Sequence, residues 1–282
     1  MLNPPDHLRP GLPVWQRVVL GIVVFIYFEV GYLWGQRGHS IETSFYGNSE
    51  WDALVPLIPE FIVPYTLGYI FVFVPMLLFK HRADYFWGAS IFIIGMSLAF
   101  LVFKFFPVYM DKDYATGNDI FSRLTYHQQY SDTDYNNCPS LHVSLNLYCW
   151  ILLFMKFGRP MLWLIWMPLT IMASTVLVKQ HLLMDIAAGI VWGGLMGAGF
   201  YWARFKLNNS EMIGKWLFRL CLVFIVIVLA LNLKHMARAF ELFSMFVAEG
   251  SSVILATVVI TALALLALKL INRNKHHIDS SH

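Results

Sequence analysis

The stretch NNCPSLHVS places a serine and a histidine at the start of an apolar segment. Proline suits the first turn of a helix, where its missing N–H is not needed, so Pro139 indicates a helix start that Asn136 or Asn137 can cap. The free N–H groups at such a helix start attract anions. Ser140 adds a hydroxyl there, and His142 adds a group that titrates near neutral pH. The stretch is therefore a candidate anion site.

A second polar cluster, STVLVKQHLLMD, lies further along the chain between two apolar segments. His181 and Asp185 are four positions apart, so they share one face if this stretch is helical. A carboxylate that holds one imidazole nitrogen fixes the tautomer and makes the other nitrogen a better nucleophile. Lys179 adds a positive charge two positions before this histidine. The cluster thus combines a candidate nucleophile, its orienting group and a cation.

Together the two clusters suit phosphoryl transfer, in which positioning and charge neutralisation supply most of the catalysis. They offer two imidazoles, a carboxylate, hydroxyl groups, a cation and a helix N-terminus. These residue types alone leave open which histidine is the nucleophile. A single histidine at a helix end is more often an interface residue than a catalyst. Two histidines and an aspartate on one membrane face favour function, because ionisable groups at membrane depth are costly.

The elements that must position these groups are membrane helices. The 282-residue chain is 58% hydrophobic and only 13% charged, whereas soluble proteins have about 25% charged residues. A bilayer core takes about 20 helical residues, and eight apolar segments come close to that length. We expect an all-α, polytopic membrane helical bundle with about eight transmembrane helices around a six-helix catalytic core. The eight segments are roughly 16–35, 60–79, 84–106, 140–157, 161–179, 184–203, 216–233 and 250–271.

The chain is expected to form a single integral membrane domain over residues 1–282. Its motif-bearing core covers about 50–203, and residues 207–282 add C-terminal helices and a tail. The net charge of +3 is too small to argue for a nucleic-acid partner, and three cysteines make no even disulfide framework. We expect no metal and no cofactor; the sequence leaves the oligomeric state open.

Lysine and arginine in the connections predict the orientation. The connections at 80–82, 156–159 and 204–215 are basic, whereas those at 37–59 and 107–139 are long and rich in acidic residues. The basic connections and both termini are expected on the cytoplasmic side of an inner or plasma membrane. The two polar clusters then face the periplasm or the exterior.

The two motifs also resemble a known family. PSxH followed by S-x6-H-x3-D resembles the type 2 phosphatidic acid phosphatase superfamily of membrane phosphatases and phosphotransferases. NCPSLHVS and STVLVKQHLLMD are most similar to the branch that includes the fungal inositol phosphorylceramide synthases. The segment Asp52-x3-Pro56-x2-Pro59-x5-Tyr65 is similar to an element of that branch as well. The resemblance covers roughly residues 50–200.

The resemblance implies a metal-independent reaction in two steps. His181 would attack phosphorus and form a phosphohistidine, while Asp185 would orient its ring. His142 would protonate the leaving oxygen and then activate the incoming water or alcohol. Ser140 and nearby backbone N–H groups would hold the phosphate oxygens.

The chain departs from the third family motif, which begins with Ser-Arg. Here the motif begins with Ser174-Thr175, so one phosphate-binding cation is missing. Lys179 is the candidate to replace it, and Ser174 keeps its hydroxyl for the phosphate. The plainer interpretation is that Lys179 extends from its helix end towards water.

The chain also departs from the first family motif, K-x6-R-P. The sequence FKFFPVYMDK offers Lys104, and Lys112 takes the arginine position when the motif is aligned on Phe106-Pro107. Lysine supplies a point charge rather than a bidentate fork, so phosphate contacts are expected to be rearranged. The plainer interpretation of Lys112 is a solvated loop charge.

These observations predict a lipid phosphatase that hydrolyses a lipid phosphate monoester or diphosphate through a phosphohistidine at the outer membrane face. The alternative is a phosphotransferase that moves a phospho-head group to a lipid alcohol. The expected partners are the lipid phosphate and the bilayer. A transporter or lipid-binding protein without catalysis is the rival from another class, and it would be typified by broken helices and inverted halves.

Overall fold

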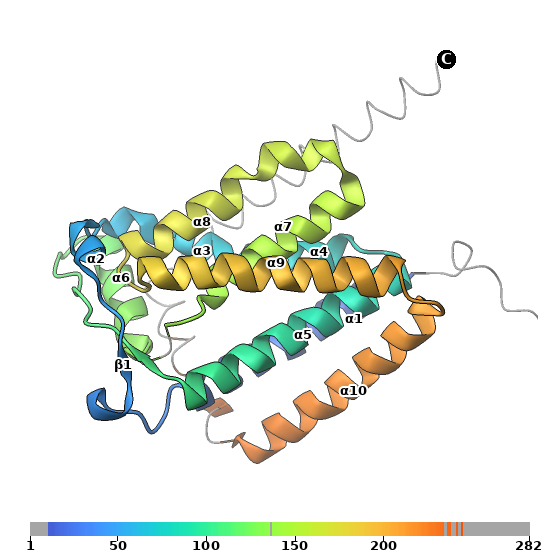
Figure 1. Cartoon of the computed structure of the whole chain (residues 1–282), viewed down its shortest axis with the longest axis horizontal. Coiled ribbons are helices and arrows are strands. Elements are labelled where there is room, and N and C mark those ends of the chain that lie inside the picture. The colour runs from blue at the N-terminus through green and yellow to red at the C-terminus, as the bar shows by residue number, and fades with distance from the viewer. Residues whose placement is uncertain (1–10, 136, 234–235, 238–240, 242–243, 245–282) are drawn as a thin grey trace, which may run out of the picture.

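The protein is a bundle of α-helices in which short polar segments gather at one end (Figure 1). The computed structural model describes residues 11–135, 137–233, 236–237, 241 and 244. The α-helices are α1 (Val14–Gly35), α2 (Glu50–Leu54), α3 (Ile62–Phe71), α4 (Val74–Leu78), α5 (Arg82–Phe105), α6 (Ile120–Ser131), α7 (Leu141–Phe157), α8 (Trp166–Leu177), α9 (Leu183–Phe205) and α10 (Ser210–Leu231). The other elements are 3₁₀ turns at Ile41–Thr43, Pro59–Phe61 and Arg159–Leu164, and the strands β1 (Phe45–Tyr46) and β2 (Val108–Tyr109).

The expectation of an all-α membrane bundle is confirmed. Within the described residues, six helical spans are long and apolar enough to cross a membrane by length and composition, and α7 is a shorter apolar helix. The predicted segments 60–79 and 161–179 are each a short 3₁₀ turn continued by α-helix. The predicted eighth segment, 250–271, lies outside the described residues.

Two features of the long polar connections were not predicted. Residues 120–131 form α6, whose N-terminus is capped by the Asp119 carboxylate, which accepts hydrogen bonds from the Phe121 and Ser122 amides. The two-residue strands β1 and β2 pair in parallel, Phe45 with Val108. Together they make the loop end of the bundle an ordered layer rather than a loose connection.

Glycines bring α9 into close contact with α7. A Cβ atom at Gly189 would lie 2.9 Å from the Ser140 carbonyl oxygen, and one at Gly193 would lie 2.6 Å from that of Ser144. Small residues four apart allow membrane helices to approach closely, since lipid supplies no hydrophobic force between them. These close contacts at Gly189 and Gly193 place the N-terminal turns of α7 and α9, which carry the two motifs, beside each other.

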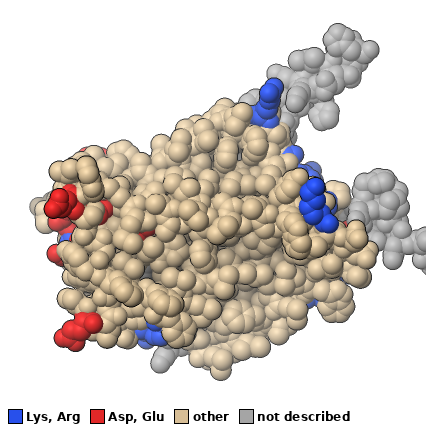
Figure 2. Space-filling view, in the orientation of Figure 1, with Lys and Arg blue, Asp and Glu red and all other residues tan. Residues whose placement is uncertain are grey.

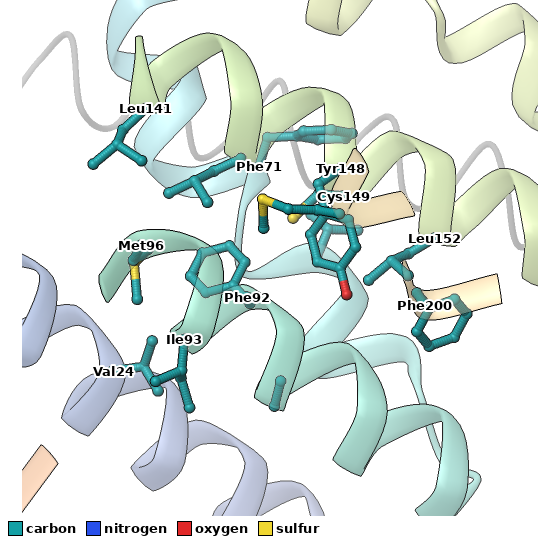
Figure 3. Packing of buried hydrophobic residues seen from close by; sticks show 14 of the residues in the cluster. Val24, Phe71, Phe92, Ile93, Met96, Leu141, Tyr148, Cys149, Leu152 and Phe200 are labelled. Carbon is teal, nitrogen blue, oxygen red and sulfur yellow. The ribbon is translucent and has the colours of Figure 1, made fainter. Parts of the chain in front are cut away.

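Large apolar side chains fill the space between the spanning helices. Figure 3 shows Phe92 of α5 close to Tyr148 and Cys149 of α7, and Ile93 of α5 beside Val24 of α1. The Tyr148 hydroxyl donates a hydrogen bond to the Gly88 carbonyl at 3.0 Å, so its polar atom is satisfied inside the core. This packing fixes the position of α7 within the bundle.

The two ends of the bundle differ in charge. Figure 2 shows acidic residues at the end that carries α2 and basic residues mainly at the opposite end. At the basic end Asp84 of α5 accepts hydrogen bonds from Lys156 of α7 at 2.5 Å and from Arg204 of α9 at 2.7 Å. This buried carboxylate joins three spanning helices at the end opposite the two motifs.

Candidate active site

The two motifs meet through their backbones. The Ser140 N–H donates a hydrogen bond to the carbonyl oxygen of Asp185 at 3.2 Å. The Ser140 hydroxyl is fully buried and accepts a hydrogen bond from the Val143 amide at 3.4 Å, so it caps α7. The expectation that Pro139 lies in the first helical turn is wrong, because the helix begins at Leu141.

The predicted asparagine cap is also corrected. The Asn137 side chain donates hydrogen bonds to the carbonyl oxygens of Val108 and Asp134 and so binds the neighbouring loop instead of the helix. Asn136 lies outside the described residues. The Ser140 hydroxyl oxygen, which is expected to face a phosphate, is therefore also the group that caps the start of α7.

His181 and Asp185 lie side by side in a buried position. His181 Nδ1 is 3.4 Å from Asp185 Oδ2, and the two side chains are 5% and 0% exposed. The same carboxylate oxygen accepts a hydrogen bond from the Leu182 amide at 2.8 Å. Asp185 is therefore held by the first turn of α9 and faces the imidazole that it is expected to orient.

A tight reversal presents His181 to the site. Lys179 has a positive φ of 52°, a left-handed conformation that is uncommon for residues other than glycine. The amides of Gln180 and His181 both donate hydrogen bonds to the Thr175 carbonyl, at 3.0 and 3.1 Å. These two hydrogen bonds close the turn between α8 and α9 and fix the position of the His181 backbone.

His142 is held by aromatic rings of α3. Its ring stacks on Tyr65 with centroids 4.0 Å apart and meets Tyr69 edge-on at 4.7 Å. His142 Nε2 lies 2.8 Å from the Tyr65 carbonyl oxygen. Because a carbonyl only accepts, Nε2 carries a proton here. Among the described residues, no hydrogen bond or ion pair joins His142 to His181 directly.

The two lysines expected to bind phosphate are engaged with protein oxygens. Lys112 Nζ donates to the carbonyls of Asp132 and Thr133 and lies 3.3 Å from Asp134 Oδ1. Its ammonium is buried rather than solvated in a loop. Lys112 therefore joins α6 to the loop that precedes α7.

Lys179 is likewise buried and does not simply extend into water. Its Nζ donates a hydrogen bond to the Asp52 carbonyl at 3.0 Å and lies 3.5 Å from Asp113 Oδ2. The Asp113 carboxylate is 77% exposed, so a substrate anion can compete for this cation. Lys179 is nearer to His181 in the chain than Lys112 is, because it lies two positions before this histidine.

Ser174 lies further from the expected role. Its hydroxyl is fully buried and donates to the Ile171 carbonyl at 2.6 Å within α8. Thr175 makes the corresponding bond to Met172 at 2.8 Å. In this arrangement both hydroxyls satisfy their own helix.

Asp52 and Gln180 were missed as site residues by the sequence reasoning. Asp52 Oδ1 accepts a hydrogen bond from the Leu183 amide at 2.8 Å, so α2 binds the start of α9. Gln180 is fully buried, and neither its Oε1 nor its Nε2 has a partner among the described residues. Unpartnered buried polar atoms are costly, and those of Gln180, His181 Nδ1 and Asp185 Oδ1 fall within one six-residue stretch. That stretch has free capacity for polar contacts.

Cys138, within the first motif, is a free thiol. Burial, followed by the negative charge of Asp185, raises the pKa of Cys138 to about 11. The thiolate is the reactive form of cysteine, so this side chain is a poor nucleophile near neutral pH.

The Asp52 carboxylate should give the fold a pH-dependent contribution. Burial raises its pKa, but hydrogen bonds from the Ser49 hydroxyl and from the Leu183 and Ser49 amides outweigh that effect and hold the pKa below its usual value. The contribution is present above the usual value of about 4 and is lost as pH falls through the lower folded value.

We expect Asp52→Asn to lower the melting temperature at neutral pH, since a neutral amide accepts hydrogen bonds more weakly. The difference from wild type should shrink as the pH falls below about 4, as measured by scanning fluorimetry in detergent. Asp111→Asn, at an exposed position nearby, is the control and should change little. A difference that grew on acidification would contradict this assignment.

A comparison with models of protein families finds a match to the segment that carries both motifs. Residues 111–209 match the model of the PAP2 superfamily. The PAP2 match supports an enzyme of the lipid phosphatase or phosphotransferase type, and its range includes His142, His181 and Asp185. No curated protein and no solved structure matches the chain. The helices α1 to α5 and α10 lie outside the residues that match the PAP2 model.

Proposed function

We propose that this protein is a membrane-embedded lipid phosphatase that hydrolyses a lipid phosphate monoester or diphosphate through a phosphohistidine. The observation that carries the proposal is the buried His181–Asp185 pair, joined through the Asp185 backbone to the capped start of α7. A nucleophile, its orienting carboxylate and a helix N-terminus thus occupy one end of the bundle. The PAP2 match supports the reaction class.

The first step transfers the phosphoryl group to the enzyme. His181 Nε2 attacks phosphorus while Asp185 holds Nδ1, so the P–N bond forms as the bond to the lipid oxygen breaks. His142 supplies the proton that the leaving oxygen takes up. Ser140, the nearby amides and Lys179 stabilise the charge on the phosphate oxygens, with Lys112 and Ser174 in supporting positions.

The second step returns the enzyme to its starting state. His142, now without its proton, removes one from an incoming water, whose oxygen attacks phosphorus. The P–N bond breaks, inorganic phosphate leaves, and His181 is restored. The proton that His142 gives up in the first step is recovered in the second, so the enzyme is unchanged after one cycle, and we expect this cycle to need no metal and no cofactor.

A phosphotransferase is the second candidate, and the surroundings of His142 favour it. His142 lines a largely apolar cavity together with Leu141, Leu145 and residues of α1, α3 and α5. Such a lining suits a lipid alcohol better than bulk water. If the donor is a phosphodiester whose phospho-head group is carried on His181, and a lipid alcohol replaces water in the second step, the product is a new phosphodiester.

The charge asymmetry of the bundle supports an outward-facing site. Basic residues lie mainly at the end opposite the two motifs, and acidic residues lie at the motif end (Figure 2). The positive-inside rule then assigns the motif end to the periplasm or the exterior of an inner or plasma membrane.

Phosphate release in the presence of a chelator tests the proposal. Purified protein in mixed micelles is expected to release phosphate from phosphatidic acid or from a polyprenyl diphosphate at an unchanged rate after treatment with EDTA. Mass spectrometry with added ceramide, diacylglycerol or inositol separates free phosphate from phosphate transferred to the added alcohol. Complete and reversible loss of turnover with EDTA would exclude the metal-independent route.

A further inference from the structure

The segment that crosses the motif end between α1 and α3 contacts the His181 turn along its length. We call residues 45–58 the strap. Its Ile58 amide donates to the Leu177 carbonyl at 2.8 Å, and its Asp52 carbonyl accepts from Lys179. A Cβ atom at Gly47 would lie 2.6 Å from a methyl carbon of Leu182, so the strap backbone packs directly on the turn.

The opposite side of the strap carries large apolar side chains that nothing in the described part of the chain covers. Trp51 and Leu54 of α2 are 71% and 73% exposed, and Phe45 and Tyr46 of β1 are similarly exposed. Trp51 and Leu54 are three positions apart, which places them on one side of this short helix, while Asp52 points inward. The strap is thus polar towards the active site and apolar outward.

This apolar surface continues onto the spanning helices. Leu183 and Met184, in the first turn of α9, are exposed, and the Leu183 amide is the group that donates a hydrogen bond to Asp52. Phe105 and Phe106, at the end of α5, are exposed and precede β2, which pairs with β1 of the strap. The outward side of the strap therefore joins surfaces that face lipid hydrocarbon, at the level where the spans end.

Charge on the strap indicates which lipid surface fits it. Glu50 is exposed and lies at the start of α2, next to Trp51, and the strap contains no lysine or arginine. Interfacial helices that bind anionic lipids carry basic residues on their polar face. The strap suits a zwitterionic surface, where Trp and Tyr rings pack at the headgroup level and a carboxylate meets choline or ethanolamine groups.

We propose that the outer side of the strap docks into the headgroup region of a zwitterionic bilayer leaflet and thereby holds the His181 turn in place. Trp51 and Leu54 are the inserted side chains. Asp52 is a positioning residue that transmits their placement to Leu183 and Lys179. The membrane surface then becomes part of the support of the site, and the site is fully ordered only where its lipid substrate resides.

Trp51 fluorescence tests the docking without any activity. The full chain is reconstituted in phosphatidylcholine nanodiscs, with and without lipids brominated near the carbonyl end of one chain. The Trp51 signal is obtained as the difference between wild type and Trp51→Phe. We expect this difference to be quenched by the bromines and to resist aqueous iodide. Quenching by iodide without quenching by bromines would overturn the proposal.

Two further variants provide a second test and a control for this measurement. Leu54→Trp should add a bromine-quenched signal, because Leu54 lies on the same side of α2. Trp87→Phe is the matched control: Trp87 is buried between α5 and the start of α10, so its difference signal should respond to neither quencher. If the Leu54→Trp signal is quenched by iodide alone, the strap does not dock into lipid.

The link to the active site rests on the proposed function and has a separate readout. Trp51→Ser/Leu54→Ser should lower kcat for phosphate release severalfold, both from phosphatidic acid in phosphatidylcholine vesicles and from a short-chain phosphatidic acid dispersed as monomers, because both substrates react at the same His181 turn, while the melting temperature should stay close to that of wild type. A fall in melting temperature that accompanies the loss of activity would assign Trp51 and Leu54 to fold stability alone, and a loss confined to the vesicle substrate would contradict the link to the His181 turn. If wild type releases no phosphate, the proposed function fails while the fluorescence result still decides docking.

Discussion

Replacement of His181 by alanine is expected to abolish turnover, lowering kcat by more than about 10⁴-fold. The reason is geometric: Nδ1 of His181 lies 3.4 Å from the buried Asp185 carboxylate, on a turn closed by two hydrogen bonds to the Thr175 carbonyl. Cys138 cannot take over the attack, because its raised pKa keeps it protonated. Phosphate release from a lipid phosphate, measured with the folded variant in micelles, checks this expectation.

A matched histidine variant separates chemistry from folding. His127 lies on α6 at the same end of the bundle and makes an edge-on contact with Tyr126, outside the two motifs. His127→Ala should keep activity within about threefold, as surface changes of this kind usually cost little. Rapid quenching of wild type with labelled substrate should trap an acid-labile, alkali-stable phosphoramidate that His181→Ala lacks. Full activity in His181→Ala would refute the nucleophile assignment.

Replacement of His142 by glutamine should affect the two chemical steps differently. Glutamine retains an N–H for the Tyr65 carbonyl, so the contact to α3 can persist, but it cannot exchange a proton. With a lipid phosphate the rate should fall by about 10²–10⁴-fold, the usual range for loss of general acid–base catalysis. With an aryl phosphate, whose leaving group needs no proton, the first step should be largely preserved.

The aryl phosphate then reveals the step that remains impaired. Since water is no longer activated, the phosphohistidine should accumulate in His142→Gln and appear as a burst of released phenol followed by slow turnover. The matched variant Asn146→Gln, one turn along the same helix, tests whether disturbance of α7 alone produces this pattern. A uniform loss for both substrates without a burst would remove His142 from the proton-transfer role.

The sequence predicted the spanning helices because apolar length alone determines them. It also predicted that the two motifs lie at one end, since the basic connections placed both motifs on the opposite side of the membrane. Helix α6 was missed because its residues are polar and lack an apolar stretch, although Asp119 followed by a helical pattern was a readable cap. Short elements beside a membrane depend on contacts that hydropathy does not report.

The phosphate-binding residues were harder to predict. Lys112 was assigned by alignment, but its ammonium is bound to three residues of the loop at 132–134, a contact that depends on how α6 returns to the bundle. The environment of His142 was equally hidden, because Tyr65 is far from it in the chain and only the packing of α3 on α7 stacks the rings. Residue types gave the chemistry, and tertiary packing decided which groups remain available for it.

The link between Ser140 and Asp185 is made by main-chain atoms, and so is the glycine contact between α9 and α7. Neither depends on which side chains the motifs carry. We call these backbone contacts between α7 and α9 the frame of the site. Side chains at the motif positions can be exchanged while this frame persists. Such a frame is readily evolvable: the side chains around His142 can determine whether water or an alcohol is the acceptor, with no new architecture.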